Sequence, residues 1–202
     1  MPVPPALAPD STYEAAAWTG GVLEEADAED CTFLDCTLEG LTVAGGGWER
    51  TSWRGGALSA VRILGGRFAR SRWRDVRFEG TALSGCELYG AQLRGSRFTA
   101  GMLDTVNLRG AALEDVTFTD CVLRDVDLGG ARLTRVSMAG CRIERLDLTK
   151  ATLSEVDLRG AQLDIARGVD RLGGAVLEIG QVLELAPAIA AHLGIDVRYP
   201  QA

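Results

Sequence analysis

Histidine is almost absent from this sequence, which limits its capacity for catalysis and metal binding. The single histidine among 202 residues, His192, stands between alanines and a leucine, with no neighbouring thiol or serine. Nucleophilic and acid–base catalysis commonly pair histidine with such groups, and no metal-ligand spacing appears either. The glycine-rich stretch Gly45-Gly46-Gly47 lacks the Lys-Ser/Thr that completes a phosphate-binding loop. We therefore expect a protein that is not an enzyme and that holds no metal or cofactor.

Proline is missing from the middle of the chain, and long apolar runs are missing from all of it. The six prolines stand at positions 2, 4, 5, 9, 187 and 200, so none interrupts backbone hydrogen bonding between them. No stretch approaches the roughly 18 apolar residues of a membrane span. The Pro-rich start also lacks the basic and apolar regions of a secretory signal. We therefore expect a cytoplasmic protein that does not enter a membrane.

Basic residues are absent from the first 49 positions, although these carry ten carboxylates. The balance reverses between residues 50 and 77, where eight arginines accompany a single acidic residue, Asp75. We call these eight the arginine belt: Arg50, Arg54, Arg62, Arg67, Arg70, Arg72, Arg74 and Arg77. The formal net charge of the whole chain is −7, so the location of the charges matters more than their total.

What the sequence does contain is a repeat of five residues. From Trp18 to Leu163 every fifth residue is apolar, which gives thirty positions without an insertion. A second register, two residues earlier in each unit, is mostly small. A period of five fits neither the 3.6 residues of a helical turn nor the alternation of a strand. Each pentad is therefore a unit that buries its apolar residues by stacking on its neighbours, as in a solenoid, and recurrent glycine at its last position predicts a turn every five residues.

The cysteines follow the same pattern. All five lie on the second register: Cys31, Cys36, Cys86, Cys121 and Cys141. We expect each to point inward as a small hydrophobic residue rather than to ligate a metal. Cys121 and Cys141 lie twenty residues apart, so stacking on adjacent coils would permit a disulfide between them, with free thiols as the favoured alternative.

Several pentads resemble the A(D/N)LXX signature of pentapeptide repeat proteins. The units at 106–110 (VNLRG), 126–130 (VDLGG) and 156–160 (VDLRG) carry the resemblance, which extends over about three quarters of the chain. It implies an all-β solenoid, a right-handed quadrilateral β-helix with four pentads per coil. The sequence alone leaves that number open, because aromatic residues recur at twenty from Phe78 to Phe98 but at fifteen from Trp18 to Phe33.

We expect three segments: an N-terminal tail at 1–10, the β-helix at 11–165, and a C-terminal helical cap at 166–202. After Leu163 the pentad is lost, and residues 177–193 have helical spacing. Pro187 leaves one kinked helix and two short helices as alternatives. The apolar stripe of this segment either covers the last coil or, as the resemblance implies, contacts a second copy in a homodimer. It consists of Ile179, Val182, Leu183, Ala186, Ile189 and Leu193.

The resemblance also implies a function. Several pentapeptide repeat proteins, including those of quinolone resistance, act as DNA mimics that bind DNA gyrase or topoisomerase IV and inhibit or protect it. In this hypothesis carboxylates replace DNA phosphates. The candidates are Glu24, Glu25, Asp27, Glu29, Asp30, Asp35 and Glu39 at one end, with Glu87, Asp127 and Asp147 along a stripe.

The alternative is a structural or assembly scaffold that binds other proteins and not topoisomerases. In that case the arginine belt of one copy pairs with the acidic end of another. Direct nucleic-acid binding is not expected, because the aromatic residues near the belt, Trp53, Phe68 and Trp73, lie on the inward register and are not available for base stacking.

Overall fold

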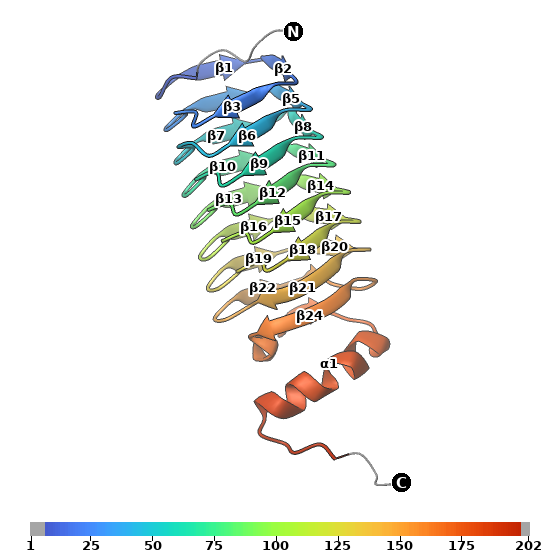
Figure 1. The fold of residues 1–202 in the computed structure, drawn as a ribbon. Helices are drawn as coiled ribbons and strands as arrows, with labels where there is room; N and C mark the ends of the chain where they lie inside the picture. The colour runs from blue at the N-terminus through green and yellow to red at the C-terminus, as the bar shows by residue number, and fades with distance from the viewer. Residues whose placement is uncertain (1–6, 199–202) are drawn as a thin grey trace.

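The computed structural model describes residues 7–198 and shows a rod of stacked coils (Figure 1). Three parallel sheets of eight, nine and eight strands form three sides of the rod, which we call faces A, B and C. The fourth side, face D, is a column of single-residue parallel bridges between residues twenty apart, from Asp27 to Asp147. Each coil thus places one pentad on each of four sides, which confirms the predicted quadrilateral β-helix.

Most strands are three residues long, and successive strands of one face lie twenty residues apart. Face A contains β1 (Thr12–Glu14), β4 (Thr32–Leu34), β7 (Ser52–Arg54), β10 (Arg72–Arg74), β13 (Gln92–Arg94), β16 (Ala112–Glu114), β19 (Arg132–Thr134) and β22 (Thr152–Ser154). Face B contains β2 (Ala17–Thr19), β5 (Thr37–Glu39), β8 (Ala57–Ser59), β11 (Arg77–Glu79), β14 (Arg97–Thr99), β17 (Thr117–Thr119), β20 (Ser137–Ala139), β23 (Val156–Asp157) and β25 (Ala175–Val176). Face C contains β3 (Val22–Glu24), β6 (Thr42–Ala44), β9 (Arg62–Leu64), β12 (Ala82–Ser84), β15 (Met102–Asp104), β18 (Val122–Arg124), β21 (Arg142–Asp147) and β24 (Gln162–Arg167). We number the coils from residue 11, so that coil 1 is 11–30 and coil 8 is 151–170.

The chain turns at the corners between faces in the left-handed backbone conformation. The last residue of a pentad has positive φ, whether it is glycine, as at Gly40 with φ of 60°, or not, as at Ala100 with φ of 50°. This confirms the predicted turn every five residues. Eighteen residues other than glycine, within 7–198, adopt positive φ. Because this conformation is unfavourable for L-residues, the ladder hydrogen bonds on both sides of each corner must hold it in place.

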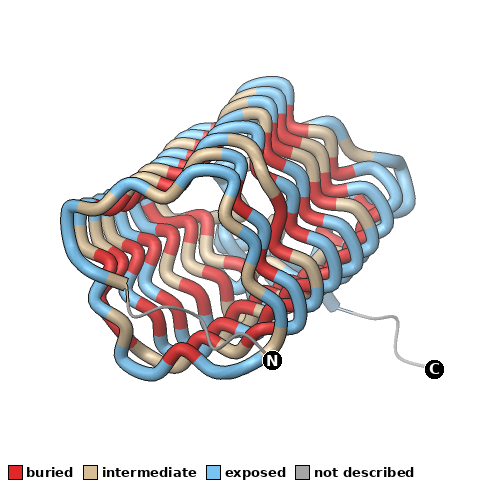
Figure 2. The backbone as a smooth tube through the Cα atoms, turned by 90° about the horizontal axis from the view of Figure 1, so that it is seen from above, coloured by how far each residue is buried: buried red, intermediate tan, exposed pale blue. Residues whose placement is uncertain are grey.

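The inward residues form one continuous core along the rod. Viewed along the axis, buried residues recur at the same place in successive coils (Figure 2). Aromatic rings stack from coil to coil, with centroid separations of 3.9 Å for Phe33 and Trp53 and 4.9 Å for Trp53 and Trp73. A second stack joins Phe78 to Phe98 at 4.1 Å. These partners are twenty residues apart, which decides between the two spacings that the sequence left open.

The second register contributes small buried side chains that also bond between coils. All five cysteines are free thiols with at most 2% of their surface exposed, which confirms their predicted inward position. Two hydroxyl residues of this register, Thr81 and Ser96, donate to the carbonyl 23 residues earlier, on the preceding coil. Thr81 Oγ1 lies 2.7 Å from the carbonyl oxygen of Leu58, and Ser96 Oγ lies 3.4 Å from that of Trp73. These bonds explain how hydroxyls are accommodated in an apolar core.

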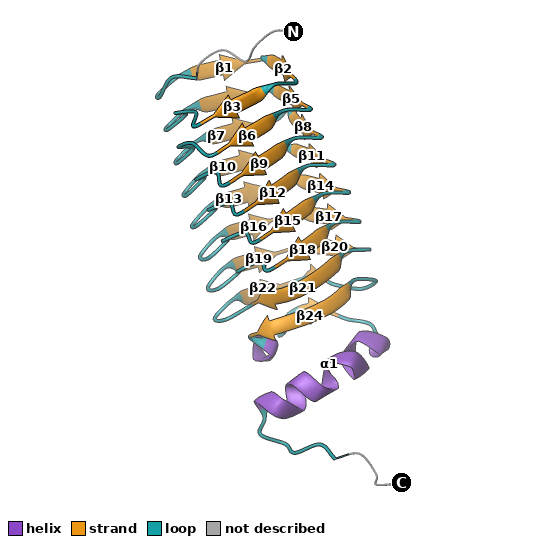
Figure 3. Cartoon of the chain, viewed as in Figure 1, coloured by secondary structure: helices purple, strands orange, loops and turns teal. Residues whose placement is uncertain are grey.

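The C-terminal segment leaves the pentad pattern and ends in a single helix (Figure 3). The pairing of β24 with β21 shifts register after Leu163, and a 3₁₀ turn, η1 (Val169–Arg171), and β25 follow. Helix α1 (Ile179–His192) contains Pro187 without ending there, so one helix rather than two is present. No helix in the described part of the chain has the length and apolar character needed to cross a membrane.

Helix α1 lies across the end of the rod and is anchored there by one polar side chain. Gln181 Nε2 donates to the carbonyl oxygens of Leu158 and Ala161, each at 2.7 Å. Its Oε1 accepts from the backbone N–H of Glu178 at 2.8 Å, at the start of the helix. Gln181 and Leu185 are the buried residues of α1. The predicted helical cap is therefore confirmed. Within the rod the next coil donates hydrogen bonds to such carbonyls, and at the last coil Gln181 does so instead.

Candidate partner-binding surface

The acidic residues predicted at one end of the rod lie around its perimeter rather than on one side. We call them the acidic end. Glu24 closes strand β3 on face C, Asp27 lies on face D, and Glu39 closes β5 on face B. Asp30 and Asp35 occupy corners, with φ of 59° and 50°. The sequence predicted that these residues lie at the same end of the rod, but it did not predict that they are spread over three of its faces.

Arginine neutralises part of the acidic end. The Arg50 guanidinium lies 2.9 Å from Glu29 and 2.6 Å from Asp30, and its hydrogen bond holds the pKa of Asp30 below the usual range. Glu25 accepts the backbone N–H of Gly46 at 3.2 Å. Ion pairs within 4.0 Å are absent at Glu24, Glu25, Asp27, Asp35 and Glu39 across residues 7–198. Five of the seven candidates therefore keep an uncompensated charge.

The predicted stripe on face D is more strongly compensated. Asp127 lies 3.0 Å from the Arg109 guanidinium and accepts the N–H of Gly129 at 2.8 Å. Asp147 accepts the N–H of Thr149 at 2.8 Å and has Arg167 at 3.6 Å. Glu87, the third candidate, accepts a hydrogen bond from the Asn107 side chain at 2.7 Å. The two aspartates thus stabilise the turn that leaves face D, a structural role that the sequence did not reveal.

The arginine belt is compensated at only three of its eight positions. Arg50 pairs as described, Arg67 lies 3.0 Å from Glu49, and Arg77 lies 3.8 Å from Glu79. The other five have no carboxylate within 4.0 Å among the residues described: Arg54, Arg62, Arg70, Arg72 and Arg74. The aromatic residues beside the belt are buried, as predicted, with Trp53 and Phe68 each 2% exposed and Trp73 3% exposed.

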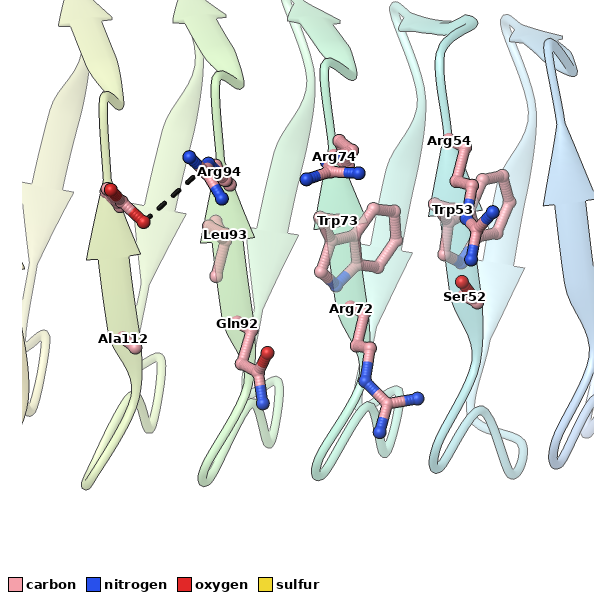
Figure 4. Close-up of a pocket in the computed structure, with 11 residues that line it drawn as sticks. Ser52, Trp53, Arg54, Arg72, Trp73, Arg74, Gln92, Leu93, Arg94 and Ala112 are labelled. Atoms are coloured by element: carbon pink, nitrogen blue, oxygen red, sulfur yellow. Dashed lines mark ion pairs between the residues drawn. The ribbon is translucent and has the colours of Figure 1, made fainter.

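Three of these uncompensated arginines share a groove on face A, with a volume of about 280 Å³ (Figure 4). Outward side chains of neighbouring strands line its two sides. Arg54, Arg74 and Arg94 follow one side, at the ends of β7, β10 and β13. Ser52, Arg72 and Gln92 follow the other side, at the starts of the same strands. The groove was not predicted from the sequence. Its signal is the recurrence of arginine at 54, 74 and 94, and an interval of twenty residues places side chains next to one another only if each coil contains four pentads.

The apolar stripe of α1 lies largely in contact with solvent. Ile179, Leu183 and Leu193 are 76%, 67% and 66% exposed, whereas Leu185 is buried against the rod. Val182 and Ala186 are also exposed, and Ile189 is half-buried. The contact with the last coil therefore uses Gln181 and Leu185, and most of the predicted dimerisation residues remain exposed within residues 7–198.

Residues that suggest other chemistry are dispersed. His192 is exposed in the last turn of α1. Within 7–198, no three His, Cys, Asp or Glu side chains cluster in a way suited to holding a metal ion.

Residues 71–148 match the family model described as "Pentapeptide repeat region". This segment of the chain is therefore similar to a pentapeptide repeat region. The matched residues lie within coils 4 to 7. The same four-sided geometry is present in coils 1 to 3, which the family model does not cover. The five-residue repeat thus extends structurally beyond the matched segment.

Several solved pentapeptide repeat structures are similar to this chain. HetL, which is involved in heterocyst differentiation regulation in the cyanobacterium Nostoc sp. strain PCC 7120, is 17% identical, with a TM-score of 0.49 and coverage of 87% of this chain and 92% of its own. Rfr23 from the cyanobacterium Cyanothece 51142 is 22% identical, with a TM-score of 0.36 and coverage of 44% and 60%. Full-length QnrB1, a plasmid-mediated fluoroquinolone resistance protein, is 16% identical, with a TM-score of 0.28 and coverage of 91% and 100%. No curated protein matches the chain.

Proposed function

We propose that this protein is a non-enzymatic, cytoplasmic binding rod whose acidic end occupies the DNA-binding surface of a type II topoisomerase. The proposed partners are DNA gyrase and topoisomerase IV. Occupation of that surface inhibits the enzyme or protects it, and protection from a quinolone would confer antibiotic resistance. The observation that carries the proposal is the density of uncompensated negative charge on the first two coils.

That density is comparable with the charge of DNA. Residues 10–49 carry ten carboxylates and no base, and Glu29, Asp30 and Glu49 are the three that pair with arginine from beyond this segment. Of the other seven, all but Asp10 lie on coils 1 and 2, so six uncompensated carboxylates occupy about 10 Å at the spacing of adjacent strands. Duplex DNA presents about six phosphates over the same length. A basic protein surface that binds duplex DNA would therefore meet a similar linear charge on this rod.

The stripe on face D contributes less in this proposal. Asp127 and Asp147 already interact with arginines and backbone N–H groups, so a partner gains less by approaching them. Arg67 also interrupts the column between coil 2 and coil 4. We therefore place the main contact at the acidic end and assign Glu87, Asp127 and Asp147 a secondary role.

We also propose that the protein is a homodimer through α1. The exposed stripe with Ile179, Leu183 and Leu193 supports this contact, because large apolar side chains on one helix face favour burial against a matching surface. Such a dimer would place the two C-terminal ends together and leave both acidic ends free. Sedimentation equilibrium should give twice the monomer mass, and Leu183→Glu should give the monomer mass, with Glu184→Gln as an exposed control on the same helix.

The functional proposal is tested by gyrase supercoiling with increasing amounts of the protein, with and without a fluoroquinolone. The test variant carries Glu24→Lys, Asp27→Lys and Glu39→Lys, all exposed residues of the acidic end. The control variant carries Glu155→Lys, Asp164→Lys and Glu184→Lys, also exposed but in the C-terminal half. Both variants change the net charge by the same amount, so only the position of the charge differs.

We expect the unaltered protein and the control variant to inhibit or protect gyrase, and the test variant to have lost the effect while keeping its melting temperature. An equal loss in both variants would show that overall charge, and not the acidic end, is responsible. No effect of the unaltered protein at micromolar concentration would refute the topoisomerase proposal.

The five uncompensated arginines of the belt support a second candidate function, an assembly scaffold. Arg62, Arg70 and the groove arginines of one copy would meet the acidic end of another, forming chains of rods. Screening weakens contacts between exposed charges, so sedimentation should show assemblies at low salt that dissociate as the ionic strength rises. A mass that does not change with salt would exclude this arrangement.

A further inference from the structure

We propose that the groove on face A is a binding site for an oligophosphate group, such as inorganic triphosphate or the phosphate chain of a nucleotide. The site lies apart from the acidic end of the same chain, and the proposal does not depend on a topoisomerase partner.

The groove is lined along both sides by side chains that donate hydrogen bonds. Arg54, Arg74 and Arg94 form a column on successive strands, since Arg74 is the ladder partner of both other arginines. Ser52, Arg72 and Gln92 form the facing column, with Arg72 as the ladder partner of the other two. Guanidinium groups bind phosphate oxygens through paired, charge-assisted hydrogen bonds, and serine and glutamine add neutral donors. A multiply charged anion can therefore be held from both sides.

The chain itself does not satisfy these charges. Like charges directly opposite each other in a ladder are destabilising. Nevertheless Arg54, Arg74 and Arg94 lie directly opposite one another on three adjacent strands. The sole carboxylate among the lining residues is Glu114, which lies 3.6 Å from Arg94 and is shared with Arg135 at 2.8 Å. Arg54, Arg72 and Arg74 have no carboxylate within 4.0 Å in the part of the chain that is described. An anion between the two columns would remove this repulsion.

The length of the column favours a short anion. Leu34 precedes Arg54 in the ladder and Glu114 follows Arg94, so an apolar residue and an acidic residue close the two ends. Three strands at the spacing of a sheet give the arginine column a length of about 10 Å. The groove volume of about 280 Å³ is close to the lower limit of small-ligand pockets, which suits a short anion rather than a polymer. A group of two or three linked phosphates matches these dimensions.

Two observations disfavour a nucleic-acid strand in the same groove. The neighbouring aromatic residues, Trp53 and Trp73, are 2% and 3% exposed, so no ring is available for base stacking. A long polyanion leaving the groove toward the N-terminus would also meet the acidic coils 1 and 2. The recognition is therefore directed at the phosphates alone.

The test is isothermal titration of the full chain with sodium triphosphate at constant ionic strength, repeated with adenosine triphosphate. The test variant is Arg54→Gln with Arg74→Gln. The control variant is Arg62→Gln with Arg97→Gln, two exposed arginines on faces C and B that have the same effect on net charge. Because these bonds are charge-assisted, we expect the test variant to bind at least about tenfold more weakly and the control to bind as the unaltered protein does.

Both phosphate sources are informative. Equal affinity for triphosphate and adenosine triphosphate would show that the site recognises the phosphates alone. Tighter binding of adenosine triphosphate would show that the phosphate group bound at this site is that of a nucleotide. Absence of saturable binding, or an equal loss in both variants, would refute the proposal. Tighter binding of a single-stranded oligonucleotide or of a poly-glutamate peptide than of triphosphate would also refute it, since the groove would then be a surface for a macromolecule.

Discussion

Replacement of Phe98 by alanine should divide the rod into two halves that unfold separately. Phe98 is 3% exposed in coil 5 and stacks between Phe78 at 4.1 Å and Phe118 at 4.7 Å. Truncation of a buried phenylalanine costs about 3–5 kcal/mol, and the loss of two stacked neighbours places this site near the upper limit. Domains of this size are stable by only about 5–15 kcal/mol. In a solenoid each coil contacts only its neighbours, so such a loss in the middle weakens the coupling between the ends.

The two halves can be observed separately during urea denaturation. All four tryptophans, Trp18, Trp48, Trp53 and Trp73, precede Phe98, so their fluorescence reports coils 1 to 4 alone. Far-UV circular dichroism reports all coils. We expect the two signals to coincide in the unaltered protein and to separate in Phe98→Ala. The control Thr99→Ala alters the exposed next residue of the same strand and should change the free energy of unfolding by no more than about 0.5 kcal/mol. An unaltered, coincident transition in Phe98→Ala would refute the assignment of the pentad core.

Three further predictions follow from the corners, the ion pairs and the thiols. Ala100→Gly should stabilise the protein by up to about 1 kcal/mol in urea denaturation, because Ala100 has φ of 50°, whereas Ala139→Gly within β20 should destabilise it by about 0.5–1 kcal/mol. A hydrogen bond from Arg135 lowers the pKa of Asp115, so this pair stabilises the fold fully above about pH 4 and progressively less as the pH falls. The difference in urea midpoint between the unaltered protein and Arg135→Gln should therefore shrink from pH 7 to pH 3. A difference that stays constant with pH would contradict the assignment of this ion pair. Burial raises the pKa of the Cys86 thiol to about 11, so the native protein at pH 8 should react slowly with a thiol reagent at this position, and rapid reaction before unfolding would show that the core is open.

The sequence was sufficient for the repeat and its inward residues because burial fixes both. Any polar residue on the inward register must find a partner inside, as Thr81 does with the carbonyl of Leu58, so the apolar period survives along the chain. The number of pentads per coil is a different matter, since each pentad makes the same turn locally. Only contacts between coils, such as the stack of Phe33 on Trp53, distinguish twenty residues from fifteen.

Surface features were harder to predict than the core. The sequence contains Asp127 and Arg109, but their pairing depends on the lateral placement of residues eighteen positions apart. The same holds for the groove arginines, which lie far apart in the chain and side by side on face A. Helix α1 shows a third limit: its apolar stripe was evident, but the anchor on the last coil is the polar Gln181. Polar contacts of this kind depend on three-dimensional placement that a periodic pattern does not encode.

The four-sided coil has a consequence for how such a chain can change over generations. Deletion of one pentad would leave the inward register intact, so the core would still form, but every later side chain would move to the adjacent face. If the deleted pentad lay between Arg54 and Arg74, Arg74 and Arg94 would no longer follow Arg54 on face A, and the groove would be dispersed although the fold survived. Deletion of twenty residues would instead shorten the rod by one coil and keep every face in order. Insertions and deletions compatible with a working surface are thus restricted to whole coils, a stricter condition than the one that folding imposes.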